Sequence, residues 1–320
     1  MTHKARFRHQ RAIRAASFAC IALAIVALTG CAKPAATPKT DASKPATPRP
    51  AFPVTITDDA SRTVTVKAAP KRIVSLAPAN TEALFALGLG DKVVGVTSYD
   101  DYPAQVADIA KVGDFAGPNV EAVAAANPDL IVATTGVQAD VIIKLEQLGA
   151  TVVAFDPQSL DGLYSDINEL GQITGTGERA DALVADMQTK VSEVEAAVAG
   201  KDPSTAFIEI GQNPLFTAGQ GTLIDELVTI GGGKNVAVAA GYVPYSTEEL
   251  VKADPDVYLA TKGTMSDPSA LKKRAGFGDL SAVKNNRVVV LDDNLVTRPG
   301  PRIVEGLRQV AEGLHPEAFK

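Results

Sequence analysis

Residues 121–136 read EAVAAANPDLIVATTG and residues 248–263 read EELVKADPDVYLATKG, aligned without a gap at an offset of 127 residues. Seven of the sixteen positions are identical. Solenoid repeats have periods of about 20–50 residues, so this longer offset indicates two related lobes. In both copies a helix-type segment ends before a proline and an apolar strand follows. The helix end and the strand do not explain why an acid, Glu121 or Glu248, stands seven residues before each proline.

Strand-type and helix-type segments alternate on both sides of this repeat, which favours parallel sheets covered by helices. A run of 22 residues without Gly or Pro (178–199) has helical periodicity and separates the two blocks. The predicted fold is therefore α/β, with two Rossmann-like lobes, each a parallel sheet flanked by helices, joined by one long rigid helix. The predicted lobes are 54–177 and 201–320, with the linker helix at 178–200. The predicted strands are 54–57, 63–66, 72–76, 93–96, 130–133, 151–155, 206–210, 257–260 and 288–291, and the main predicted helices are 81–87, 137–148, 223–230 and 301–314.

The amino terminus has the pattern of an export signal. A basic run is followed by an apolar stretch and then by Leu-Thr-Gly before Cys31, which predicts a lipoprotein signal peptide over 1–30 with lipidation at Cys31. Residues 31–53 are rich in Pro, Ala, Thr and Lys, which is typical of a disordered tether. Because Cys20 lies in the signal and lipid blocks Cys31, the body has no thiol for a disulfide or a Cys metal site.

Charge and motif content exclude several classes of function. The body after residue 53 holds 22 basic and 36 acidic residues, so it would repel a nucleic acid. The glycine pairs do not complete a phosphate-binding loop, and we expect His315, the one histidine of the body, to be a surface residue. We expect no metal site, no cofactor and a monomer. An exported hydrolase that uses carboxylates such as Asp292 remains an alternative.

Polar and aromatic residues follow several predicted strands, where α/β sheets bind ligands. Tyrosine rings there suit a flat, partly apolar ligand with polar edges. The candidate ligand-binding residues are Tyr99, Tyr102, Phe115, Thr134, Asn213, Phe216, Tyr242, Tyr245, Asp292, Asn294 and Arg298.

These segments resemble the cobalamin and ferric-siderophore binding proteins of ABC importers over essentially the whole body. The resemblance is carried by RIVSLAPANTE (72–82), VGVTSYDDYP (94–103), NPLFTAG (213–219), GGGKN (231–235) and Pro301-Arg302. It implies a protein held by its lipid on the outer face of the cell membrane, which delivers a ligand to permease and ATPase subunits. It also implies that Glu121 and Glu248 dock onto the permease, with Glu249 as an alternative to Glu248.

The resemblance implies a cobalamin-like corrinoid or a ferric siderophore as ligand, which itself would carry the cobalt or iron. Where cobalamin-binding members have tryptophans around the corrin, the matching positions here are Phe115, Thr134 and Tyr242, with Asn294 in the last cleft loop. Arg298 and Arg302 suit an anionic iron chelate, although Arg302 could also pair within its own helix. Haem is the further alternative, with Tyr242 or Tyr245 as iron ligand, since the sequence indicates no well-placed His or Met.

Overall fold

The computed structural model describes residues 51–263 and 265–320. The predicted signal peptide (1–30), Cys31 and all but the last three residues of the predicted tether lie outside them. Between these limits, no helix has the length and hydropathy needed to cross a membrane.

A four-stranded parallel sheet forms the centre of the N-terminal lobe, in the order β4-β3-β5-β6. All its strands are rich in Val, Ile, Leu or Ala and are almost completely buried, as expected for a sheet covered on both faces. An antiparallel hairpin, β1 and β2, precedes the sheet at the predicted residues. The elements are β1 Val54–Thr57, β2 Thr63–Val66, β3 Ile73–Ser75, α1 Pro78–Ala86, β4 Val93–Gly95, α2 Val120–Ala125, β5 Leu130–Ala133, α3 Ala139–Gln147, β6 Val152–Ala154 and α4 Leu160–Thr174.

The C-terminal lobe repeats this strand order and adds two strands. Strands β9-β7-β11-β12 are parallel, like β4-β3-β5-β6. Strand β8 pairs antiparallel with β7 and β10 pairs antiparallel with β8, so the prediction of a parallel sheet is wrong for this part of the lobe. The two-residue turn at Asn213-Pro214 reverses the chain between β7 and β8. The elements are β7 Ser204–Gln212, β8 Leu215–Ala218, α6 Leu223–Ile230, β9 Gly233–Asn235, β10 Tyr242–Pro244, α7 Thr247–Ala253, β11 Val257–Lys262, α8 Ser281–Lys284, β12 Val288–Asp292, α9 Asp293–Val296 and α10 Ile303–Leu314.

The same carboxylate locks the central strands together in both lobes. Asp129 precedes β5 and accepts hydrogen bonds from the backbone N–H groups of Lys71 and Arg72, at 2.8 and 2.9 Å, just before β3. Its counterpart Asp256 precedes β11 and accepts from the backbone N–H (3.0 Å) and hydroxyl (2.6 Å) of Thr205 in β7. The sequence repeat is therefore a structural repeat as well.

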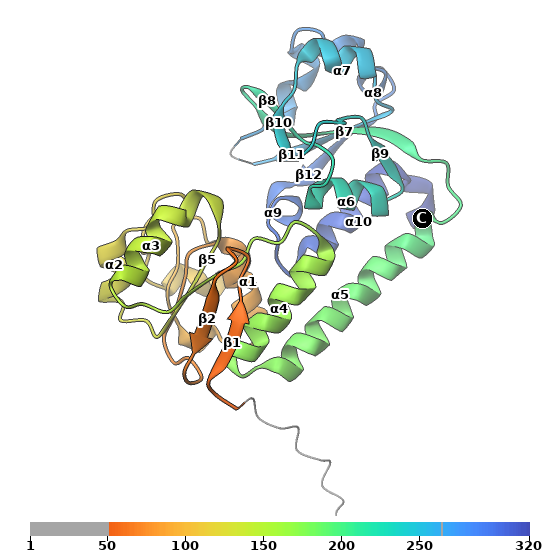
Figure 1. The fold of residues 1–320 in the computed structure, drawn as a ribbon. Coiled ribbons are helices and arrows are strands. Elements are labelled where there is room, and N and C mark those ends of the chain that lie inside the picture. Colours follow the sequence, from red (N-terminus) through yellow and green to blue (C-terminus); the bar gives the residue numbers. More distant parts are fainter. Residues whose placement is uncertain (1–50, 264) are drawn as a thin grey trace, which may run out of the picture. The chain divides into compact units, whose positions relative to one another are not determined.

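The long helix α5 (Gly177–Val198) forms where it was predicted, but it is packed on both sides. It lies against α4 (Figure 1) and also contacts α10 and α6, and its buried residues belong to one apolar cluster with residues of these helices and α1. Helix α4 was not predicted. Its Gly171 allows a close approach to α5, because a Cβ there would lie 2.5 Å from the Cβ of Ala180.

Candidate ligand-binding site

The predicted acids occupy the same position on two equivalent helices. Asn119 caps α2 by accepting from the Ala122 N–H (2.9 Å), and Ser246 caps α7 by accepting from the Glu249 N–H (3.0 Å). Glu121 and Glu248 are thus the second residue of their helices, and both are exposed. Each helix therefore has an exposed acid at the same position of its first turn.

Glu248 and the adjacent Glu249 differ in their contacts. The Glu249 carboxylate closes a capping box by accepting from the backbone N–H and the hydroxyl of Ser246, at 3.2 and 2.9 Å. The bond from the Ser246 hydroxyl lowers the pKa of Glu249. Within residues 51–320, as far as described, Glu248 has no hydrogen-bond or ion-pair partner, so it is the acid free to meet another molecule.

A hollow of about 500 Å³ joins two of the predicted ligand residues, Asn213 and Phe216, with Met265. It surrounds the turn between β7 and β8, and the described residues that line it carry no charge. Phe216 lies in β8 rather than in a loop. Met265 was missed by sequence reasoning, which found no well-placed methionine, yet its side chain is 63% exposed beside the hollow. The lining residues are Gly211, Gln212, Asn213, Pro214, Phe216 and Met265.

Three further predicted residues meet near Asp101, which follows β4. Arg298 donates to the Asp101 carboxylate at 2.6 Å, and Asn294 donates to it at 3.1 Å. Arg298 also reaches the backbone oxygen of Tyr99 at 3.5 Å. Because Asp101 and Tyr99 belong to the N-terminal lobe, these contacts connect the two lobes through predicted ligand-binding residues.

A buried acid of α1 engages both candidate arginines. The Glu82 side chain is 2% exposed, and Arg302 binds its two oxygens at 2.9 and 2.6 Å. Arg298 lies 3.4 Å from the same carboxylate, and Arg302 also stacks on the ring of Tyr102 at 3.8 Å. Arg302 thus pairs across the lobes and not within its helix. Both arginines already have carboxylate partners, which lessens their use for an anionic ligand.

Gln138 organises two other predicted residues. Its side chain is fully buried, donates to the backbone oxygens of Leu76 and Phe115 at 2.7 Å each, and accepts from the Thr134 N–H at 3.0 Å. Sequence reasoning missed Gln138, because two of its three partners, Leu76 and Phe115, are 62 and 23 residues away in the chain. It fixes the relative positions of the loops that carry Phe115 and Thr134.

The remaining predicted residues differ in their surroundings. Tyr242 lies in β10 and is 47% exposed. Its pKa is raised by the loss of water around its hydroxyl and, to a smaller extent, by the negative charge of Asp156. The Tyr245 ring lies 5.1 Å from that of Phe207, against the core of the C-terminal lobe. Asp292 caps α9 by accepting from the Asn294 N–H at 3.0 Å. Neither Tyr245 nor Asp292 lines the hollow beside Asn213 and Phe216.

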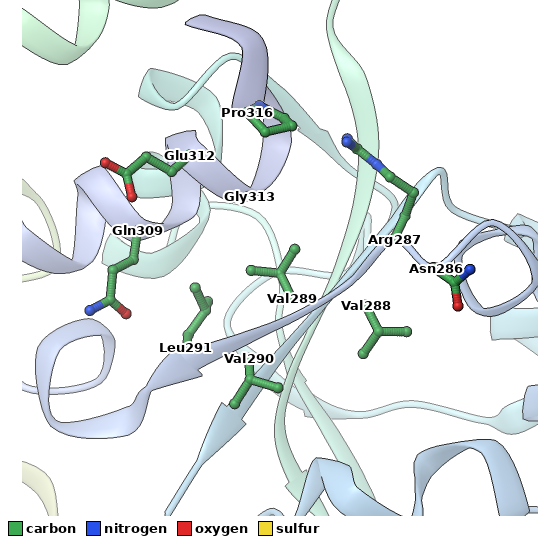
Figure 2. A pocket seen from close by; sticks show the side chains of 10 residues that line it. All are labelled: Asn286, Arg287, Val288, Val289, Val290, Leu291, Gln309, Glu312, Gly313 and Pro316. Atoms are coloured by element: carbon green, nitrogen blue, oxygen red, sulfur yellow. The ribbon is translucent and has the colours of Figure 1, made fainter. Parts of the chain in front are cut away.

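A second hollow of about 430 Å³ lies between β12 and α10 and contains none of the predicted ligand residues (Figure 2). His315, which follows α10, is 4% exposed and contacts the Gly232 oxygen at 3.0 Å, so its expected surface position is wrong. Among the described residues, no three His, Cys, Asp or Glu side chains are grouped so that they could hold a metal ion.

Comparisons with known proteins agree with the two-lobed architecture. The periplasmic binding protein family model matches residues 73–295. The uncharacterized ABC transporter substrate-binding lipoprotein YvrC of Bacillus subtilis is 40% identical over 316 residues, covering 96% of this chain and 99% of that protein. The vitamin B12-binding protein of Vibrio cholerae is 31% identical over 244 residues, covering 75% and 87%.

A solved structure, the periplasmic haem-binding protein RhuT of Roseiflexus, superposes with a TM-score of 0.71 at 26% identity, covering 78% of this chain and all of that one. These relatives bind solutes and are not enzymes, so the hydrolase alternative has no support. The fold, the repeated lobes and the family match together show that this chain belongs to the periplasmic binding protein family.

Proposed function

We propose that this protein is the lipid-anchored substrate-binding protein of an ABC importer and that it captures a cobalamin-like corrinoid between its lobes. The uncharged hollow at Asn213, Phe216 and Met265 carries the proposal. A corrinoid offers apolar ring area and many neutral amide groups, which match an amide, an aromatic ring and a thioether. The relative named as a vitamin B12-binding protein adds independent support.

Charge distinguishes this ligand from the alternatives. An anionic ferric siderophore or the propionates of haem would need free cations, but Glu82 and Asp101 already hold Arg298 and Arg302. Taking an arginine from a buried carboxylate would leave that acid unpaired, which is costly. A neutral ligand avoids this cost. Haem has one feature in its favour, because Met265 places a thioether, a group that can bind haem iron, at the hollow.

Calorimetry tests the ligand directly. The full chain is titrated with cyanocobalamin, cobinamide, an anionic ferric catecholate and haemin. We expect saturable binding of the two corrinoids, weakened at least tenfold by Phe216→Ala and by Asn213→Ala. Val290→Ala is the matched control, since Val290 is 53% exposed in the other hollow and should leave affinity unchanged. Binding of only the catecholate or haemin would refute the corrinoid assignment.

Docking is proposed to depend on the two free acids, Glu121 and Glu248. Paired charges at equivalent places on two lobes would orient the protein on basic residues of the permease and favour its association rate. The double variant Glu121→Lys, Glu248→Lys should abolish uptake of labelled cyanocobalamin in cells and leave its Kd unchanged. The double variant Glu193→Lys, Glu195→Lys, at exposed positions of α5, is the charge-matched control. Normal uptake by the double variant would contradict this docking role.

Membrane attachment is proposed to come from lipid on Cys31. Cys31→Ala should move the protein from the membrane fraction to the soluble extracytoplasmic fraction and preserve corrinoid binding by the released protein. Retention of the variant in the membrane fraction would refute a lipid anchor at this residue.

A further inference from the structure

A buried carboxylate lies in β7, two residues before Gly211, which lines the hollow. Glu209 is completely buried and accepts hydrogen bonds from the Tyr258 hydroxyl (2.5 Å), the Ser266 hydroxyl and the Arg274 guanidinium. The Arg274 side chain is itself only 18% exposed. A charge removed from water to this extent requires such partners, so the arrangement of Ser266 and Arg274 around Glu209 is strongly constrained.

Gln212 fixes the same segment to the end of β7. Its side-chain oxygen accepts from the second Arg274 nitrogen (2.7 Å) and from the Asp267 N–H (3.2 Å). Its backbone N–H donates to the Met265 oxygen at 3.0 Å. Glu209 and Gln212 together therefore tie residues 265–274 to β7 through polar contacts at the Met265 backbone and at residues that follow it in the chain.

Met265 forms one wall of the hollow from within this segment. Met265 is exposed, and a Cβ on Gly211 would lie 3.4 Å from its terminal methyl group. Methionine is flexible and makes favourable contacts with aromatic rings. Because the Met265 side chain is flexible, its position at the hollow depends on a fixed backbone. The neighbouring Ser266, through its bond to Glu209, holds that backbone in place.

We propose that Glu209 and Arg274 are positioning residues that hold Met265 at the ligand hollow and thereby set the affinity for the ligand. Neither residue needs to touch the ligand. The inference rests on the proposed function for its effect on affinity, whereas the position of Met265 can be measured without any ligand.

Methyl NMR supplies that ligand-free measurement. The sequence has three methionines, and Met187 is 1% exposed in α5, so its methyl signal reports whether the fold is intact. In Glu209→Gln we expect the Met265 methyl signal to move toward its position in an unfolded chain, with Met187 unchanged. Met265→Leu assigns the signal. If Glu209→Gln fails to fold, Arg274→Lys replaces it, because a single ammonium group cannot reproduce both bonds of the planar guanidinium.

A double-mutant cycle gives the second readout. Glu209→Gln should raise the Kd for cyanocobalamin at least tenfold, mainly through faster dissociation, and Met265→Ala should have a similar effect. Combining them should add little, since both remove the same wall. A folded variant with an unmoved Met265 signal, or fully additive effects on Kd, would overturn the proposal. Failure of the parent to bind cyanocobalamin would refute the proposed function instead, and the methyl shift would still decide the positioning role.

Discussion

Replacing Glu82 with glutamine removes one charge from the contact between the lobes and retains the shape of the side chain. Glu82 is 2% exposed and binds Arg302 through both oxygens. Breaking a buried ion pair from one side costs about 3–5 kcal/mol. Arg298 keeps Asp101 as a partner and both guanidinium groups retain some contact with water, so we expect the lower end, about 3 kcal/mol. At ~2–4 °C per kcal/mol, the Tm should fall by about 6–12 °C.

Urea and thermal unfolding followed by far-UV circular dichroism would measure this loss in a chain without tryptophan. Glu312→Gln is the matched control, because its pair with Arg308 is exposed on α10 and should contribute at most ~0.5 kcal/mol. The loss for Glu82→Gln should also persist at high salt, since buried pairs are weakly screened. A loss no greater than that of the control, or one that disappears in salt, would refute the interpretation of Glu82 as a buried link between the lobes.

Two further changes have defined outcomes. Burial, with repulsion from nearby acids including Asp59, raises the pKa of Asp166 from 3.8 to about 8. The parent protein should therefore lose stability as the pH rises through this range, and the Tm gain of Asp166→Asn should grow from pH 5 to pH 9. Parallel Tm profiles of the two proteins would contradict this. A Cβ on Gly219 would lie 1.9 Å from the Ala239 oxygen, so Gly219→Ala should lower the free energy of unfolding in urea by about 1–3 kcal/mol or more. Gly177→Ala is the control and should not destabilise the protein, because a Cβ there would meet no atom within 4 Å. Equal stability of the two variants would show that the backbone shifts to make room at Gly219.

The sequence repeat predicted the architecture well, since it contains a helix end, a proline and an apolar strand in each lobe. The strand at 130–133 and the helix at 223–230 have the predicted bounds. Helix α4 was missed because Gly162 and Gly171 interrupt its apolar pattern, although that pattern has helical spacing. Strands β8 and β10 were missed because each is short and contains residues that also suit a ligand loop.

Local sequence marks candidate residues such as Asn213, which directly follows a strand, and Phe216, an aromatic residue close to it. Gln138 and Glu209 bind partners that are 62 and 65 residues away in the chain. No local sequence pattern marks such contacts. Arg302 illustrates the same limit, because its acid is more than 200 residues distant. Local patterns report which residues are polar or apolar, whereas these pairings depend on the tertiary fold.

The strands that distinguish the lobes bear on how the protein arose. Both lobes keep the order of four parallel strands, as expected if one ancestral half was duplicated. The C-terminal copy alone has β8 and β10 among the described residues, and these strands carry Phe216 and Tyr242. If Phe216 and Tyr242 contact the ligand as proposed, exchanging β8 and β10 between relatives would change the ligand contacts while the four parallel strands of each lobe are kept.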